Sequence, residues 1–264
     1  GALNSPVDEN GANRKSEATL ATYMMQSNLN TSFTGDDNLY VRLKTGNATG
    51  WQKDYKYGTY LSSSKGNSDV VKVDKIWYSF PVGNNTFWVG PKIENYYMHG
   101  TTPSIYKPVL KQFTLGGNGA AYGASTSPGA GWAYKADNGF AISSNFATKN
   151  GHTTTGMLTR EGDTSWATQI GYTKPSYSAS IMVNQKFNGW TDSYYTTPLG
   201  KARPNEADST NIGLRGWWRP DDSGTAVPSI SLGYDTSSVD GQNQDTNAYF
   251  VGLTWQDAFT PDDR

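Results

Sequence analysis

The sequence predicts an all-β fold, an antiparallel β-barrel that crosses a membrane through its strands. Three observations predict it. Segments in which apolar and polar residues alternate recur along the chain, bounded by Gly, Pro, Asn and Asp. Short and long connections alternate between these segments. The hydrophobic residues, 35% of 264, are weighted towards aromatic side chains, with 9 Trp, 17 Tyr and 9 Phe.

Eleven segments carry the alternation, and most are close to the nine to eleven residues that a tilted strand needs to cross a bilayer. In order they are 19–33, 37–46, 73–82, 86–97, 129–136, 139–148, 164–174, 177–187, 209–219, 227–236 and 246–256. Convincing helical periodicity is absent, apart from a short helical turn expected near 103–112. A twelfth strand near 120–124 remains an alternative.

The hairpin at 73–97 shows the two faces most clearly. Ile76, Tyr78 and Phe80 fall on one face of its first strand, whereas Lys75 and Trp77 fall on the other. The second strand continues the pattern, with one face formed by Phe87, Val89, Pro91 and Ile93 and the other by Trp88, Gly90, Lys92 and Glu94. Because successive side chains of a strand point to opposite sides, the pattern predicts one apolar and one polar environment.

The remaining segments sort in the same way. The expected outward residues are Leu39, Val41, Leu43, Phe140, Ile142, Phe146, Trp166, Ile170, Tyr172, Ala179, Ile181, Val183, Ile212, Leu214, Trp218, Ile230, Leu232, Tyr234, Tyr249, Val251, Leu253 and Trp255. The opposite faces carry mainly hydroxyl, amide and charged side chains. We therefore expect the outer face to meet hydrocarbon and the inner face to meet water. Aromatic residues cluster near strand ends, as in the girdles at the lipid headgroups.

The connections alternate in length. The short ones are 34–36, 83–85, 137–138, 175–176 and 220–226, and the long ones are 47–72, 98–128, 149–163, 188–208 and 237–245. Tight turns at one end and long loops at the other are typical of an outer-membrane barrel, whereas a soluble β-sandwich mixes its connections. This parity places residues 1–17 on the extracellular, long-loop side and predicts further strands before and after the chain.

Charged residues recur on the predicted inner wall. The expected pore-lining residues are Arg42, Lys44, Lys75, Lys92, Glu94 and Arg215. A Lys or Arg facing lipid at mid-membrane would cost about 2–4 kcal/mol, so these positions support the assignment of the faces. Basic residues in a pore favour anions. The alternative is that they pair with acidic residues such as Glu94 and brace the wall.

The segment 98–128 is too long and too apolar for an ordinary surface loop. Its apolar residues are Ile105, Tyr106, Val109, Leu110, Phe113 and Leu115. We expect it to fold into the barrel as a constriction loop, with Lys107 and Lys111 facing the opening, because an apolar segment must find cover. Packing against a neighbouring subunit is the alternative.

Composition argues against several other classes. The formal charge of -1 without basic runs argues against nucleic-acid binding, and the lack of Cys removes disulfides and thiol chemistry. His99 and His152 are isolated, and 240–245 lacks the terminal Glu of an EF-hand. Neither a phosphate-binding loop nor a nucleophile elbow is present. We therefore expect no metal, no cofactor and no enzymatic activity.

Four stretches together resemble a known family: "SNLNTSFTGDDNLYVRLKTGN" (27–47), "VDKIWYSFPVGNNTFWVGPKI" (73–93), "FTLGGNGAAYGASTSPGAGWAYK" (113–135) and "VPSISLGYDTSS" (227–238). They resemble the barrel domain of cyanobacterial outer-membrane porins, in the OprB-type group of carbohydrate-selective and iron-uptake porins. The resemblance implies a 16-stranded barrel, usually trimeric, that passes inorganic ions and small solutes. It also implies an N-terminal S-layer-homology domain and closing strands, neither of which is expected within 1–264.

The sequence and the resemblance together predict part of one porin barrel in a bacterial, cyanobacterial outer membrane. We expect a water-filled channel for passive diffusion of ions and small hydrophilic solutes, surrounded by lipid and assembled as a homotrimer. Two other interpretations stay open. In one, the chain is a secreted carbohydrate-binding or adhesion module whose aromatic residues stack on sugars. In the other, the aromatics fill a soluble core.

Overall fold

The structure is a computed structural model, and it describes residues 21–53, 60–190, 207–222, 224–241, 243 and 245–260. The predicted extracellular segment 1–17 lies outside the described residues, as does most of the long connection 188–208. Among the described residues the only helices are three single 3-10 turns, η1 (Gly50–Lys53), η2 (Asn95–Met98) and η3 (Lys111–Phe113). No described helix is long and apolar enough to cross a membrane.

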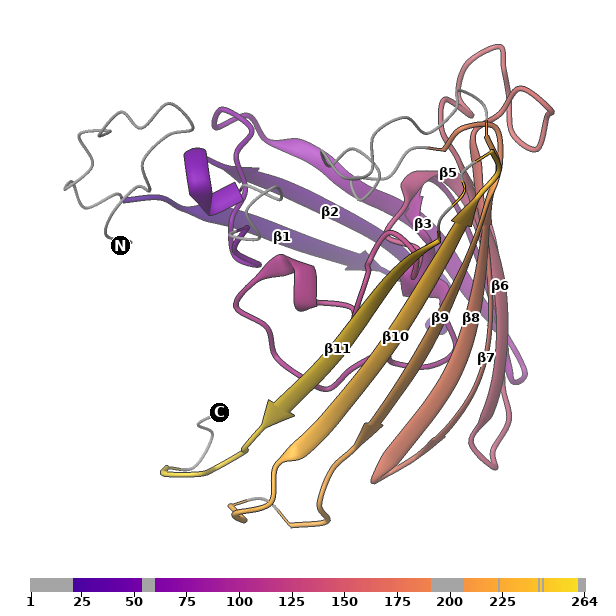
Figure 1. Ribbon diagram of the computed structural model, residues 1–264. Coiled ribbons are helices and arrows are strands. Elements are labelled where there is room, and N and C mark those ends of the chain that lie inside the picture. The colour runs from indigo at the N-terminus through magenta and orange to yellow at the C-terminus, as the bar shows by residue number, and fades with distance from the viewer. Residues whose placement is uncertain are drawn as a thin grey trace.

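Eleven strands form one antiparallel sheet whose spatial order follows the sequence (Figure 1). They are β1 (Met24–Thr31), β2 (Asn38–Gly46), β3 (Lys72–Val82), β4 (Asn85–Glu94), β5 (Thr126–Lys135), β6 (Phe140–Thr148), β7 (Thr164–Lys174), β8 (Tyr177–Lys186), β9 (Ser209–Trp218), β10 (Ser229–Val239) and β11 (Thr246–Thr254). The predicted all-β class is confirmed, with consecutive antiparallel strands in one sheet. Residues 120–124 are not a strand, so the described count is eleven.

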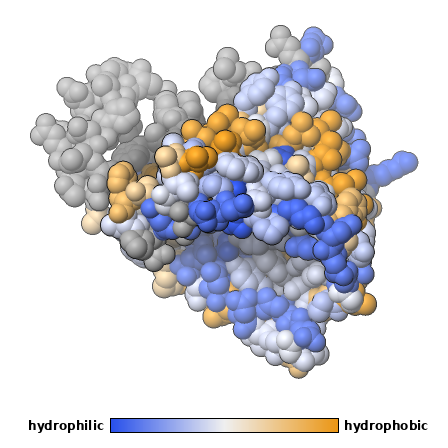
Figure 2. All heavy atoms as spheres, turned by 90° about the horizontal axis from the view of Figure 1, so that it is seen from below, coloured by the Kyte–Doolittle hydropathy of each residue, from blue (hydrophilic) through white to orange (hydrophobic). Residues whose placement is uncertain are grey.

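The sheet is strongly curved, and β1 and β11 are its two edges (Figure 1). The segment between β4 and β5 lies on the concave side of the sheet (Figure 1). In Figure 2, which is seen from below, hydrophilic residues surround the hollow and hydrophobic residues gather along the flanks. The concave side is therefore the inner face of the wall.

Burial in this sheet is reversed relative to a water-soluble core. On β10, Leu232 and Tyr234 were expected outside, and Leu232 is 51% exposed, whereas Ser231 and Asp235 are 1% exposed. Strands β6 to β9 and β11 agree, because the exposed apolar residues include Trp166, Ile170, Ile181, Leu214, Val251 and Leu253, and the fully buried polar ones include Ser143, Asn145, Asn184 and Asn211. Apolar residues pointing out from every part of a sheet with a polar interior are typical of a wall that meets lipid.

Three of the strand pairs contain a register shift, and all three lie between β2 and β5. The shifts fall between Arg42 and Leu43, between Ile76 and Tyr78, and between Gly90 and Ile93. A bulge inserts a residue and so reverses the alternation beyond it. This corrects the expectation for Ile93, which is fully buried against Tyr40 and Trp77 rather than facing outward.

Leu214→Arg tests the outer face. In a lipid-facing position this change should lower the free energy of unfolding by about 2–4 kcal/mol, because the charge enters hydrocarbon. Urea titrations of protein folded into lipid vesicles measure it, with Leu214→Ala as the uncharged control. If the exposed Leu214 met water instead, the arginine variant would differ from the parent by less than about 0.5 kcal/mol.

Candidate functional site: the inner wall and segment 98–128

The outgoing half of segment 98–128 is held along the inner wall by polar side chains of four strands. Backbone N–H groups donate to side-chain oxygens, from Gly100 to Ser143 Oγ (3.1 Å), from Thr101 to Gln169 Oε1 (2.9 Å) and from Ile105 to Ser231 Oγ (3.2 Å). Trp217 Nε1 donates to the carbonyl of Thr102 (3.2 Å). The segment thus passes β6, β7, β9 and β10 in turn, and the small polar residues of the inner wall are its hydrogen-bond partners.

An ion pair on the wall holds the returning half. Arg215 Nη2 donates to Asp235 Oδ1 (2.8 Å) and Oδ2 (3.1 Å), and both side chains are 1% exposed. Arg215 Nε also donates to the carbonyl of Leu115 (2.7 Å), and the Asn118 N–H donates to Asp235 Oδ2 (2.7 Å). Charge-assisted hydrogen bonds of this kind are about twice as strong as neutral ones. The pair therefore binds the segment to β9 and β10.

Two glycines allow this close approach. A Cβ on Gly233 of β10 would collide with the carbonyl oxygen of Gly116, and one on Gly117 would collide with the carboxylate of Asp235. Gly117 also has a φ of +148°, which other residues rarely adopt. The "GG" at 116–117 therefore lets the backbone lie directly on the wall.

A buried junction joins the two ends of the segment. His99 Nε2 donates to the carbonyl of Tyr122 (3.0 Å), and Asn145 Nδ2 donates to His99 Nδ1 (3.2 Å). Gln169 Nε2 donates to the hydroxyl of Tyr122 (2.6 Å). Burial lowers the pKa of His99 to about 4, and burial also raises the pKa of the Tyr122 hydroxyl. The imidazole is therefore neutral at pH 7.

Only some of the apolar residues of segment 98–128 are buried or packed against other residues. Tyr106 and Phe113 pack on the Phe250 ring of β11, at 5.7 and 6.0 Å between centroids, and Leu115 is buried. Leu110 pairs with Leu61 of the connection 47–72 in an isolated β-bridge. Val109 is 71% exposed. The segment thus extends from the β9–β11 wall to the connection that follows β2.

The two lysines expected to face the opening lie apart. Lys107 is exposed and borders a hollow with Tyr106, Leu253 and Phe259. The ammonium of Lys111 lies 4.5 Å from the centroid of the Tyr60 ring.

The predicted lining residues fall into three environments. Arg42, Lys75 and Glu94 come together on β2, β3 and β4, where Lys75 is paired with Glu94, and Arg42 stands 3.9 Å from Asp74. Lys44 lies on the same face of β2 as Arg42. Arg215 points inward but is covered by segment 98–128, so it is the anchor described above.

Lys92 does not join the ion pairs that Arg42, Lys75 and Glu94 form with described residues. Its ammonium donates to the carbonyl of Val73 (2.7 Å), and no ion pair joins it to a described residue.

Two inner-face residues were missed from the sequence. The register shift after Arg42 skips Asp74, which therefore joins the inner cluster, and it sets Lys72 opposite Lys44. A bulge is defined relative to the partner strand, so the sequence of one strand alone did not locate it.

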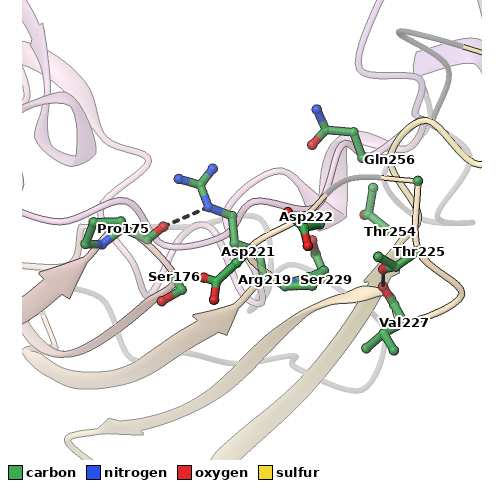
Figure 3. A pocket seen from close by; sticks show the side chains of 12 residues that line it. Pro175, Ser176, Arg219, Asp221, Asp222, Thr225, Val227, Ser229, Thr254 and Gln256 are labelled. Atoms are coloured by element: carbon green, nitrogen blue, oxygen red, sulfur yellow. Dashed lines mark hydrogen bonds between the residues drawn. The ribbon is translucent and has the colours of Figure 1, made fainter.

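A second hollow, of about 300 Å³, lies at the short-turn end of the wall, where Thr254 borders both hollows (Figure 3). It is bordered by the β7–β8 turn, the β9–β10 turn and the end of β11, and Arg219 Nε donates to the carbonyl of Pro175 there (2.8 Å). The Asp221 and Asp222 side chains beside it are exposed. Across the described part of the chain, no group of three His, Cys, Asp or Glu residues could hold a metal ion.

No known protein family and no curated protein matches the sequence. Two solved structures of outer-membrane proteins from Vibrio cholerae are similar in fold. OmpT in its in-vitro folded trimer form has a TM-score of 0.48 and 14% identity, and covers 88% of this chain and 64% of that one. The loop L8 deletion mutant of OmpT has a TM-score of 0.46 and 13% identity, with 86% and 66% covered. The chain thus spans less than two thirds of the length of these proteins.

One expectation is corrected at this point. The sequence predicts that the chain is not an enzyme, because it contains no recognisable catalytic motif. Both similar structures are of OmpT. The lack of a recognisable motif is therefore not sufficient to exclude enzymatic activity, and the expectation that the chain is not an enzyme is wrong.

His99→Gln tests the buried junction. Because folded His99 stays neutral down to about pH 4 while an unfolded histidine protonates near 6.5, the unfolded state binds more protons below pH 6.5. Stability should therefore fall by on the order of 3 kcal/mol between pH 7 and pH 4. Glutamine can donate and accept at the same places without titrating, so the variant should lack this part of the fall in urea titrations. Parallel pH profiles of the two proteins would contradict the assignment.

Asp235→Asn tests the anchor. Removing one partner of a buried ion pair leaves an uncompensated charge and costs about 3–5 kcal/mol. Segment 98–128 should then detach, and trypsin should cleave faster after Lys107 and Lys111. Asp163→Asn is the control, because its pair with Lys149 is about one third exposed and should contribute less than about 1 kcal/mol. Equal cleavage rates in both variants would show that the pair does not hold the segment.

Proposed function

We propose that this chain forms the wall of an outer-membrane porin, a water-filled channel for passive diffusion of inorganic ions and small hydrophilic solutes. The observation that carries the proposal is the reversed burial of the sheet. Leu214 and Leu232 are 43% and 51% exposed on the convex side, while hydroxyl, amide and charged groups occupy the concave side. Hydrocarbon outside and water inside satisfy both faces at once.

Segment 98–128 is the proposed constriction. It crosses the concave side from the wall at β10 to the connection after β2, with the Ile105 N–H on Ser231 and the Leu110–Leu61 bridge at its far end. A peptide segment fixed across a lumen narrows it for every solute, whatever the charge. The buried Arg215–Asp235 pair holds the segment against the wall.

The finer parts of the proposal come from the resemblance to OprB-type cyanobacterial porins. These are a cyanobacterial outer membrane as location, a homotrimer as assembly and weak selectivity among small solutes. A trimer form of the similar OmpT is compatible with this assembly. The secreted carbohydrate-binding alternative is less consistent with the fold, because apolar side chains are exposed on β6 through β11 rather than in one patch.

Deleting residues 104–112 tests the channel and its constriction together. The parent protein should conduct ions across a planar lipid bilayer, and the deletion should raise the single-channel conductance, because it removes the part of the segment that spans the lumen. Deleting 152–158 from the β6–β7 connection is the control and should leave conductance unchanged. A protein that folds in detergent but never conducts would overturn the function, whereas equal conductances in the two deletions would overturn only the constriction.

A further inference from the structure

A directed chain of hydrogen bonds fixes the protonation state of His99. Asn95 Nδ2 donates to the carbonyl of Ser165 (3.1 Å) and to Asn145 Oδ1 (2.8 Å). Asn145 Nδ2 donates in turn to His99 Nδ1 (3.2 Å), and His99 Nε2 donates to the carbonyl of Tyr122 (3.0 Å). Both ends of the chain are carbonyl oxygens, which only accept, so neither amide can turn over without bringing two donors or two acceptors together. The chain therefore requires a neutral imidazole with its proton on Nε2.

A second proton on His99 finds no acceptor among the described residues that surround the ring. It would sit on Nδ1, which faces the Asn145 amide donor of β6, while Tyr122 of the returning half lies edge-on to the ring at 5.1 Å. Behind that tyrosine, 4.6 Å from its centroid, lies the Arg215 guanidinium of β9, already paired with Asp235 of β10. Burial, together with the positive charge of Arg215, lowers the pKa of His99 to about 4.

His99 lies where both halves of segment 98–128 are attached to the wall. Gln169 Oε1 of β7 accepts the Thr101 N–H of the outgoing half (2.9 Å), and Gln169 Nε2 donates to the Tyr122 hydroxyl of the returning half (2.6 Å). The His99 ring adds its own bond to the Tyr122 carbonyl, two residues before Thr101. The buried junction is thus one connected unit, and its only titratable side chain with a pKa that water can match in mild acid is this imidazole.

We propose that protonation of His99 releases segment 98–128 from the inner wall and widens the proposed constriction in acid. The imidazole is 7% exposed, so an imidazolium reaches water only when the segment leaves the wall. The sheet stays intact, because its strands are hydrogen-bonded to one another, and the Arg215–Asp235 pair stays with β9 and β10. The inference rests on the proposed channel function and adds its regulation by pH.

The direction and the size of the effect follow from the two states. In the attached segment the pKa of His99 is about 4, whereas in the released segment it returns to about 6.5, the value in water. The attached state is therefore fully favoured above pH 6.5 and loses this advantage as the pH falls towards 4. Between pH 7 and pH 5, the ratio of released to attached segment should rise about 20-fold.

Hydrogen exchange tests the release without requiring a channel. In protein folded into lipid vesicles, the protection of the Gly100, Thr101 and Ile105 amides, corrected for the pH dependence of intrinsic exchange, should fall about 20-fold from pH 7 to pH 5. Amides within β7 should keep their protection, and an equal loss there would show unfolding of the sheet instead of release. His99→Gln should abolish the fall. His152→Gln, which removes the exposed second histidine of the chain, should retain it. Equal profiles for the two variants overturn the inference.

Asn145→Asp tests the hydrogen-bond chain independently. A carboxylate in this place accepts from a protonated His99 Nδ1 and carries the opposite charge, so a second proton should strengthen the junction. Protection of the segment at pH 5 should then be no lower than at pH 7. Release in acid that persists in this variant would contradict the role assigned to the Asn145 amide.

Single-channel recording connects the release to conductance. The parent protein should occupy a wider state more often at pH 5 than at pH 7, and His99→Gln should not. If both proteins respond to acid equally, the junction does not regulate the channel, and the inference fails while the proposed function stands. If neither protein conducts at either pH, the proposed function fails and its regulation fails with it.

Discussion

The structure depends on one constraint: each strand must present a different chemistry to each side of a single sheet. A single-layer sheet has no core between two layers. Its strands form their backbone hydrogen bonds with neighbouring strands, and each side chain must suit the environment on its own side of the sheet. Along β10, Leu232 and Ser231 are adjacent in sequence and differ in exposure from 51% to 1%. The same constraint accounts for a chain in which apolar surface stays exposed while amides and hydroxyls are buried.

The buried polar side chains become useful because segment 98–128 lies on them. Ser143, Gln169 and Ser231 accept hydrogen bonds from three backbone N–H groups of the segment, so the polar inner face supplies partners for its backbone. Arg215 and Asp235 add a charged anchor at the far side.

The sequence is sufficient to predict the strands, because alternation is a local property. Strand β7 was predicted at its observed bounds, 164–174, and the exposed faces of β9 to β11 follow the predicted pattern. The bulges were not predictable, since they exist only relative to a partner strand. They explain why Ile93 is buried, why Lys92 donates to Val73, and why Asp74 lies with Arg42 and Lys75 on the inner face.

The anchor was also beyond the sequence, because Arg215 and Asp235 meet through the register of β9 and β10 and through a loop 100 residues away. The absence of Cys makes the account directly testable by single-cysteine spin labelling. Labels placed in turn at Val41, Arg42, Leu43 and Lys44 in lipid vesicles should alternate. Positions 41 and 43 should be relaxed by lipid-soluble oxygen, and positions 42 and 44 by a water-soluble nickel complex. If positions 41 and 43 were shielded from both reagents, those side chains would lie in a protein core, which would contradict a wall between lipid and water.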